Sequence, residues 1–235
     1  MKAALQSCGF EPASPFVRAW EMSGPFAELF RSIETVTLMD RQRCYLLYCS
    51  ALQSQAVPGA TAEVGVYRGG TAFLLARARP GTPMYLFDTF AGMPRVRPDL
   101  DLHRSGDFAD TSLDAARRFV ASETAVFRPG VFPSSAAGLE GERFSLVHVD
   151  CDIYDSVRAC CEWFYPRLAP GGLLVFDDYG WPSCPGVRTA VDEFFATRPE
   201  CPLPVGQGQA LVVRLPENAP PANLAGHPGA EERAG

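Results

Sequence analysis

Acidic residues end the two most apolar segments of this 235-residue chain. Residues 144–150 read Phe-Ser-Leu-Val-His-Val-Asp, and residues 173–178 read Leu-Leu-Val-Phe-Asp-Asp. If both segments are neighbouring parallel strands, which lie about 4.8 Å apart, Asp150, Asp177 and Asp178 meet at one edge of a sheet. Three carboxylates at one place repel one another unless they are protonated or bound to a cation.

Oxygen ligands alone favour a hard divalent ion such as Mg²⁺, with water and substrate oxygens completing its coordination. Such an ion lowers the pKa of a bound hydroxyl and orients it, and a nearby carboxylate can accept the proton. The alternative interpretation is that these aspartates, Asp152 in particular, only cap the helices that follow them.

A strand-to-helix turn earlier in the chain, Glu63-Val-Gly65-Val-Tyr67-Arg-Gly69-Gly, is suited to a cofactor. Glycines let a ligand approach the backbone, and open α/β sheets bind ligands beyond the carboxyl ends of their strands. Glu63 lies in an otherwise apolar strand and needs a partner, for which the cofactor is our candidate. Asp88 ends the next strand, where a carboxylate can accept both ribose hydroxyls. The turn does not match GxGxxG, so an adenosine-containing cofactor is predicted and both NAD and S-adenosylmethionine remain open.

Alternating strands and helices must position these residues. Helices are expected over 25–33, 40–57, 71–78, 112–121, 156–168 and 186–197, and strands over 61–67, 84–90, 125–132, 144–150 and 173–177. This order predicts an α/β fold with a parallel sheet buried on both faces. Segments 205–207 and 210–215 predict a terminal hairpin. Pro170-Gly171-Gly172 is expected to end the helix before the last parallel strand, and the long loop 91–111 is typical of a functional segment.

Composition excludes several classes of protein. A hydrophobic content of 47% argues against disorder as the overall state, and a net charge of −6 argues against a nucleic-acid partner. Eight cysteines without a CxxC pair are expected to be reduced and mostly buried, as in a cytoplasmic protein. The amino terminus is a poor signal peptide, and no stretch is long and apolar enough to span a membrane.

Five blocks in order carry a family resemblance: AEVGVYRGGTAFLLA, YLFDTFAGMP, GDFADTS, FSLVHVDCDIYDSV and YPRLAPGGLLVFDDYGWPSCPGVRTAVDEF. Over about residues 36–214 the chain resembles the macrocin O-methyltransferase family, which methylates sugar hydroxyls of natural products with S-adenosylmethionine and Mg²⁺. The resemblance implies a Rossmann-like class I methyltransferase with a mostly parallel seven-stranded sheet, helices on both faces and a C-terminal antiparallel hairpin. It also implies a small hydroxylated acceptor in antibiotic biosynthesis and a homodimer or larger homo-oligomer.

The resemblance also implies roles for individual residues. Asp150, Asp177 and Asp178 match the metal ligands, and either Asp150 or Asp152 is drawn into proton removal, a choice that stays open. Cofactor contacts are expected from Thr37, Glu63, Gly65, Tyr67, Gly69, Asp88, Thr89, Ser112, Gly130 and Asp150. Leu38 replaces a usual Met, and Val213-Arg214-Leu215 replaces a usual Trp-Arg-Lys, so the identity of the acceptor is not predicted.

Three regions are expected: an N-terminal helical arm or lid over 1–57, a cofactor-binding core over 58–215 and a disordered tail over 216–235. His148 is interpreted as a hydrogen-bonded core residue and His103 as a solvated loop residue, while Trp181 is an open candidate for the acceptor wall. Two other functions remain possible: a nicotinamide-dependent oxidoreductase, which would need a catalytic Tyr-Lys or His, and a non-catalytic S-adenosylmethionine-binding relative.

Overall fold

The computed structural model describes residue 21 and residues 23–216. Its central element is one seven-stranded sheet. Its strand order is β3-β2-β1-β4-β5-β7-β6, and the first five strands are parallel. Strand β7 runs antiparallel to both neighbours, so the predicted mostly parallel sheet and terminal hairpin are confirmed. The strands are β1 (Ala60–Val64), β2 (Met84–Asp88), β3 (Ala125–Pro129), β4 (Phe144–Val149), β5 (Leu168–Phe176), β6 (Leu203–Val205) and β7 (Gln209–Val213). Most of the predicted tail and the start of the predicted arm lie outside the described residues.

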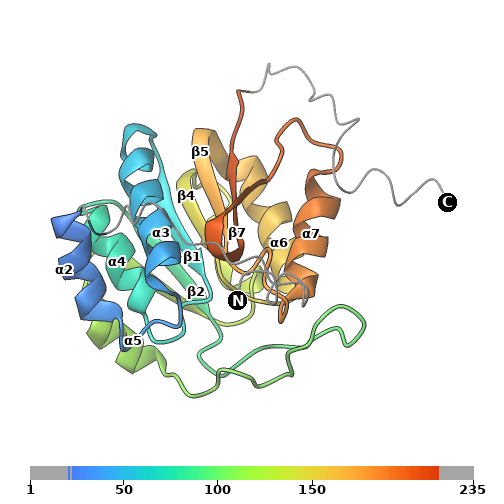
Figure 1. The fold of residues 1–235 in the computed structure, drawn as a ribbon, viewed down its shortest axis with the longest axis horizontal. Coiled ribbons are helices and arrows are strands. Elements are labelled where there is room, and N and C mark those ends of the chain that lie inside the picture. Colours follow the sequence, from blue (N-terminus) through green and yellow to red (C-terminus); the bar gives the residue numbers. More distant parts are fainter. Residues whose placement is uncertain (1–20, 22, 217–235) are drawn as a thin grey trace, which may run out of the picture.

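Helices cover both faces of the sheet, as expected (Figure 1). On one face lie α2 (Gly24–Ile33), α3 (Arg41–Gln53), α4 (Gly70–Ala78) and α5 (Leu113–Val120), and on the other lie α6 (Tyr154–Phe164) and α7 (Pro185–Phe195). Side chains alternate along a strand, so β4 sends Leu146 to the first face and Val147 to the second. The apolar run of β4 is therefore explained by burial on both sides.

Helix α3 begins directly after Asp40, the first residue of the helix expected over 40–57, and Asp40 caps it. Asp40 Oδ1 accepts the backbone N–H groups of Gln42 and Arg43 at 2.8 and 3.0 Å, which satisfies two free donors of the first turn. Asp40 Oδ2 accepts the Arg43 Nε–H at 3.0 Å. The cap thus also fixes the root of the Arg43 side chain, which points toward the carboxyl edge of the sheet.

The connection from α6 to β5 differs from the prediction. Helix α6 ends at Phe164, a 3₁₀ turn covers Tyr165–Arg167, and β5 already begins at Leu168. The stretch from Pro170 to Gly172 was expected to be a helix stop, but it belongs to the strand. Its backbone is paired, because Gly171 N–H donates to Arg214 O and Arg214 N–H donates to Gly172 O, both at 2.8 Å. A shift in register against β4 between Phe144 and Leu146 accommodates the stretch.

Gly65 lets the ends of β1 and β4 approach each other. Its φ is +92°, and a Cβ at this position would collide with the carbonyl oxygen of Asp150. The glycine is therefore required by the contact that places Asp150 at the edge of the sheet.

Gly65→Ala is expected to destabilise the fold by more than the roughly 1–3 kcal/mol of a strained backbone, because the methyl group also displaces the Asp150 backbone. Urea denaturation measures this free energy of unfolding. Gly81→Ala is the matched control, since Gly81 has a φ of +77° and no atom within 4 Å of its added Cβ. Equal losses in both variants would show that the close approach contributes nothing.

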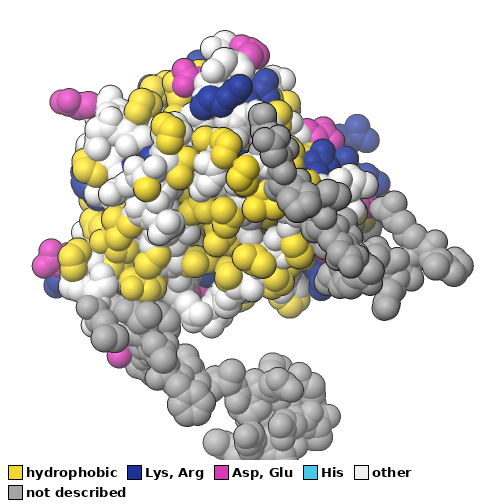
Figure 2. Space-filling model, turned by 90° about the horizontal axis from the view of Figure 1, so that it is seen from above, with side chains coloured by type: hydrophobic (Ala, Val, Ile, Leu, Met, Phe, Trp, Pro, Cys, Tyr) yellow, Lys and Arg dark blue, Asp and Glu magenta, His cyan; other side chains and the backbone are white. Residues whose placement is uncertain are grey.

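Among the described residues, no helix is both long enough and apolar enough to cross a membrane. Hydrophobic side chains gather over the middle of the face seen from above, and the Lys and Arg side chains in view are scattered rather than joined in one patch (Figure 2). All seven cysteines within the described part of the chain are free thiols.

Candidate functional site

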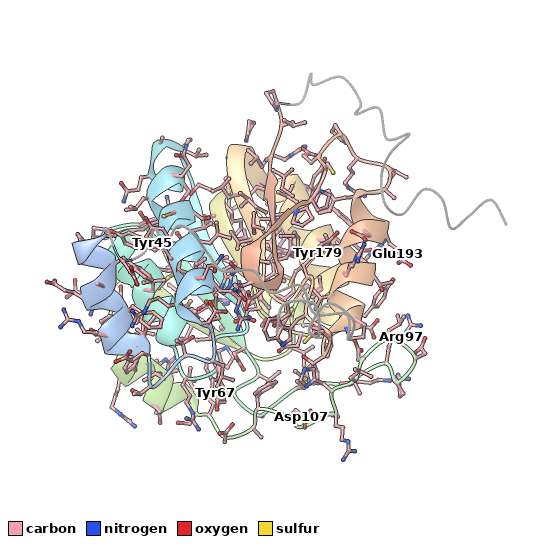
Figure 3. The ribbon with its side chains drawn as sticks, in the orientation of Figure 1. Tyr45, Tyr67, Arg97, Asp107, Tyr179 and Glu193 are labelled. Carbon is pink, nitrogen blue, oxygen red and sulfur yellow. The ribbon has the colours of Figure 1, made fainter. Side chains whose placement is uncertain are left out.

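A cavity of about 340 Å³ opens at the carboxyl ends of the central strands. Its wall brings together residues from the turns after β1, β2, β4 and β5 and from the segment before α3. Tyr67 lines the cavity and contacts Phe108, which follows Asp107 in the loop labelled in Figure 3. The predicted site residues that line it are Thr37, Gly65, Tyr67, Asp88, Thr89, Gly130, Asp150, Asp152, Asp177 and Asp178.

Three carboxylates meet in this cavity, as the strand order required. Asp150, Asp177 and Asp178 each offer an oxygen within 4.8 Å of the others. Burial and the charge of Asp178 raise the pKa of Asp177 to about 6, although Arg43 opposes the shift. Burial and the charges of Asp177 and Asp178 raise the pKa of Asp150 well above its ordinary value. Burial is the larger cause of both shifts, and repulsion between the carboxylates adds to it; a bound cation would relieve that repulsion.

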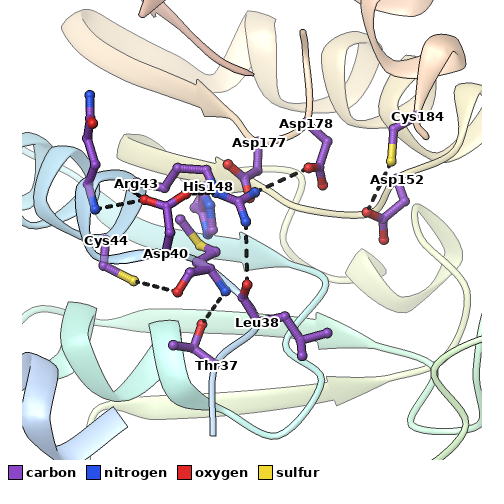
Figure 4. Close-up of polar contacts among 12 residues, drawn as sticks. Thr37, Leu38, Asp40, Arg43, Cys44, His148, Asp152, Asp177, Asp178 and Cys184 are labelled. Atoms are coloured by element: carbon purple, nitrogen blue, oxygen red, sulfur yellow. Dashed lines mark hydrogen bonds and ion pairs between the residues drawn. The ribbon is translucent and has the colours of Figure 1, made fainter. Parts of the chain in front are cut away.

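Arg43 is the site residue that the sequence did not reveal. Its Nη1 donates to Asp177 Oδ2 at 2.6 Å and to Asp178 Oδ1 at 3.2 Å (Figure 4). Its guanidinium also lies 5.3 Å from the Trp181 ring centroid. The only signal in the sequence was the spacing of Asp40 and Arg43 on one helix face, which did not show that the guanidinium reaches across to β5.

Asp152 lies next to Asp178 but is not one of the three clustered carboxylates. Its backbone is left-handed with φ of +60°, which is uncommon for a residue other than glycine and recurs at functional sites. Burial raises the pKa of Asp152 well above its ordinary value, and a hydrogen bond with Asp178 raises it further. A carboxyl group with a raised pKa that lines the cavity without belonging to the cluster has the properties of a general base.

Asp88 organises the turn that follows β1. Its Oδ2 accepts the backbone N–H groups of Val66 and Tyr67, both at 2.8 Å, and its Oδ1 accepts the Phe90 N–H at 2.7 Å. Asp88 therefore holds the backbone of the turns around it. Its Oδ2 already accepts two hydrogen bonds, and its Oδ1 accepts one and can accept one more from the cavity. On the opposite wall, Gly70 lets the chain approach at Thr37, since a Cβ would lie 2.8 Å from Thr37 Cβ.

Comparison with known proteins decides the family. The family model described as macrocin O-methyltransferase matches residues 35–204. The chain belongs to the macrocin O-methyltransferase family. A tetracenomycin-C 4'-O-methyltransferase acting on a dimethoxy-rhamnosyl compound, from Streptomyces olivaceus, is 31% identical over 167 residues, covering 63% of each chain. Mycinamicin III 3''-O-methyltransferase from Micromonospora griseorubida is 32% identical, covering 62% of this chain and 63% of that enzyme.

Solved structures agree on the fold of this family member. The O-methyltransferase NovP superposes with a TM-score of 0.68 at 26% identity, covering 77% of this chain and 82% of that chain. The calicheamicin methyltransferase CalS11 superposes with a TM-score of 0.59 at 20% identity, over 88% and 95%. The predicted class I methyltransferase fold is therefore confirmed. The chain spans 63% of the length of the curated relatives described above.

Three of the residues predicted to contact the cofactor do not line the cavity. Glu63 is fully buried, and its Oε1 lies 2.8 Å from His148 Nδ1, so a histidine of β4 is the partner of one of its two oxygens. The interpretation of His148 as a hydrogen-bonded core residue is confirmed. Ser112 caps α5 by accepting the Ala115 N–H at 3.2 Å. Gly69 packs against α5, where an added Cβ would lie 2.9 Å from Val120.

His103 was expected to be a solvated loop residue, and that interpretation is wrong. Its side chain is only 19% exposed and lines the cavity. The loop places His103 Nε2 3.5 Å from Cys184 Sγ. The residues around His103 and Cys184 in the sequence give no sign of this contact. Trp181, an open candidate for the acceptor wall, does line the cavity while remaining 41% exposed.

The acidic residues of this family member fit a hard divalent cation. Asp177 Oδ1 is buried without a hydrogen-bond partner among the described residues, which leaves a carboxylate oxygen free for coordination. The other two members of the cluster, Asp150 and Asp178, also offer carboxylate oxygens. The oxygen-only donor set suits Mg²⁺ better than a soft ion.

The thermal stability of the metal-free protein is expected to fall as the pH rises from about 4 to about 6. A folded-state pKa of about 6 for Asp177, against an ordinary value of 3.8, means that the folded state binds the proton more tightly. Its stabilisation is complete below about pH 4 and lost above about pH 6. Asp177→Asn should flatten this part of the profile, and added Mg²⁺ should stabilise the wild type most above pH 6. Superimposable profiles of wild type and variant would contradict the assignment.

Proposed function

We propose that this chain is an S-adenosylmethionine-dependent, divalent-metal-assisted O-methyltransferase that acts on a hydroxyl of a small molecule, a sugar of a glycosylated natural product. The observation that carries the proposal is the meeting of Asp150, Asp177 and Asp178 in the same cavity as the Asp88 turn. Methyl transfer needs a bound electrophilic methyl donor and a well-placed, deprotonated acceptor oxygen. The half of the cavity around Asp88 would serve the donor, and the half around Asp150, Asp177 and Asp178 would serve the acceptor oxygen.

Each half of the cavity has its own task. The turn after β1, with Asp88 and Thr89, holds the adenosine of the cofactor, and Asp150, Asp177 and Asp178 would hold the cation. When bound, a hard divalent ion supplies positive charge that makes a nearby hydroxyl more acidic. Asp152 would accept the hydroxyl proton on its carboxylate as the oxygen bonds to the methyl carbon, while the carbon–sulfur bond breaks and S-adenosylhomocysteine leaves. Arg43 holds Asp177 and Asp178 in place through its hydrogen bonds to both.

The acceptor is proposed from the relatives and from the wall of the cavity. The tetracenomycin-C enzyme acts, by its name, on a compound that carries a rhamnosyl group. Trp181 offers an aromatic face of the kind that packs on the apolar face of a sugar, beside the carboxylates that would meet its hydroxyls. The loop over 91–111 contributes Met93, His103 and Phe108 to the wall and would exclude water. A lid role for the N-terminal arm, a homo-oligomeric state and a cytoplasmic location belong to the same proposal.

Methyl transfer to a panel of glycosylated acceptors, measured by mass spectrometry, tests the function. We expect a product 14 mass units heavier for each methyl gained, turnover that stops in chelator, and recovery on adding Mg²⁺. Thermal shifts should appear with S-adenosylhomocysteine and not with NAD, which distinguishes a methyltransferase from an oxidoreductase. Full activity in chelator would exclude the metal role. Cofactor binding without a product from any acceptor would favour a non-catalytic relative.

A further inference from the structure

A second group of metal-ligating atoms lies in the cavity, separate from the three clustered carboxylates. His103 Nε2 lies 3.5 Å from Cys184 Sγ, and Cys184 Sγ lies 3.8 Å from Asp152 Oδ1. All three ligand atoms lie within 4.8 Å of one another. Figure 4 shows the contact between Cys184 and Asp152, on the side of Asp178 away from Arg43. Nothing in the proposed methyl transfer uses the thiol or the imidazole.

The spacing of these atoms suits a tetrahedral ion. Zinc bonds of about 2.3 Å to sulfur and about 2.0–2.2 Å to nitrogen and oxygen place neighbouring ligand atoms about 3.4–3.6 Å apart. The separations of 3.5 and 3.8 Å need little adjustment to meet that geometry. The donor types also differ from those of the carboxylate cluster, since a thiolate and an imidazole prefer zinc-like ions over magnesium.

His103 is held in the orientation that a metal ligand requires. Its Nδ1 lies 3.3 Å from Asp107 Oδ2, and the tautomer that donates to this carboxylate would turn the Nε2 lone pair toward the thiol. Asp107 is itself fixed, because its Oδ2 accepts the Arg104 backbone N–H at 2.8 Å. A carboxylate behind the imidazole is the usual support of a ligating histidine.

A nucleophilic cysteine is the rival explanation of the same three residues. Burial, together with the neighbouring aspartates, raises the pKa of the Cys184 thiol to about 12. Asp152 beside the sulfur disfavours the free thiolate that a nucleophilic cysteine needs. Carboxylates beside the thiol work against a thiolate and in favour of a bound cation.

We propose that His103, Asp152 and Cys184 form a site for a zinc-like divalent ion, distinct from the hard-cation site of Asp150, Asp177 and Asp178. The fourth position of the ion faces the cavity, where water or an acceptor oxygen would bind. One consequence rests on the proposed function. An ion bound to Asp152 would occupy the general base, so zinc should inhibit the methyl transfer that Mg²⁺ supports.

Binding of Co²⁺ at this site can be detected by absorption, because a Co²⁺ ion with a thiolate ligand has a charge-transfer band in the near ultraviolet. The full chain, with Mg²⁺ in excess to fill the carboxylate cluster, is titrated with Co²⁺. We expect the band to reach its plateau at one ion per chain and to be displaced by Zn²⁺. Cys184→Ser should abolish the band, whereas Cys201→Ser, at an exposed cysteine, should retain it. Asp107→Asn should weaken Co²⁺ binding about 10–100-fold by loosening His103.

Absence of the band, or its survival in Cys184→Ser, would overturn the proposal. An unchanged cobalt affinity in Asp107→Asn would also overturn the role given to His103, and this variant leaves all three ligands in place should Cys184→Ser fold poorly. Inhibition by Zn²⁺ is measured separately and should be relieved in Cys184→Ser. If the band appears while Zn²⁺ leaves methyl transfer unaffected, the metal site stands and the general-base role of Asp152 fails.

Discussion

Replacement of Asp152 by Asn is expected to lower kcat by about 10²–10⁴-fold, the range for losing a positioned general base. Asn has the shape of Asp and retains a hydrogen bond toward Asp178, so the cavity should keep its geometry, but an amide does not accept the hydroxyl proton. Because Asp152 lies outside the group formed by Asp150, Asp177 and Asp178, Mg²⁺ affinity should change little. Affinity for S-adenosylhomocysteine should also be unchanged.

Rate measurements at saturating substrate, paired with calorimetric titrations of Mg²⁺ and S-adenosylhomocysteine, separate these effects. Asp155→Asn is the matched control, since it makes the same change three residues later on an exposed position of α6. Loss of Mg²⁺ affinity along with the rate would move Asp152 into the ligand set. A rate close to wild type would leave Asp150 as the remaining candidate for the base.

Asp177→Asn is expected to remove the dependence on divalent cations and to slow turnover by about 10²–10³-fold, equivalent to roughly 3–4 kcal/mol of lost transition-state stabilisation. Asp177 offers the free oxygen of the cluster, and an amide oxygen carries no charge with which to hold the ion. The cofactor half of the cavity does not contain Asp177, so S-adenosylhomocysteine binding should survive.

The fold of this variant should also survive, because Arg43 keeps its contacts with Asp178 and Asp40. Circular dichroism, Mg²⁺ titration and the methyl-transfer rate are compared with those of Asp114→Asn, an exposed acidic position at the start of α5. Wild-type Mg²⁺ affinity in Asp177→Asn would remove Asp177 from the site. A collapse of the fold would show instead that the pair with Arg43 is chiefly structural.

Much of the fold was predictable because it depends on local patterns. Apolar strands alternating with helices leave few arrangements other than a covered parallel sheet, and Asp40 shows the start of α3 through its own short side chain. The stretch from Pro170 to Gly172 was misread as a helix stop because its backbone partner, Arg214, lies more than 40 residues away in the sequence.

The sequence by itself determined that Asp150, Asp177 and Asp178 each follow an apolar strand, and it predicted that they share one edge if those strands are parallel neighbours. The pairing of β4 with β5 meets that condition, because parallel neighbours end at the same edge of the sheet. The sequence could not determine which side chains from other layers reach that edge. Arg43 meets Asp177 across 134 residues of chain, and His103 meets Cys184 across 81. Such contacts depend on how helices and loops pack on the sheet, and no periodicity of the chain records that packing. The tertiary structure alone therefore decided that Glu63 pairs with His148 and that Asp152 faces a thiol and an imidazole.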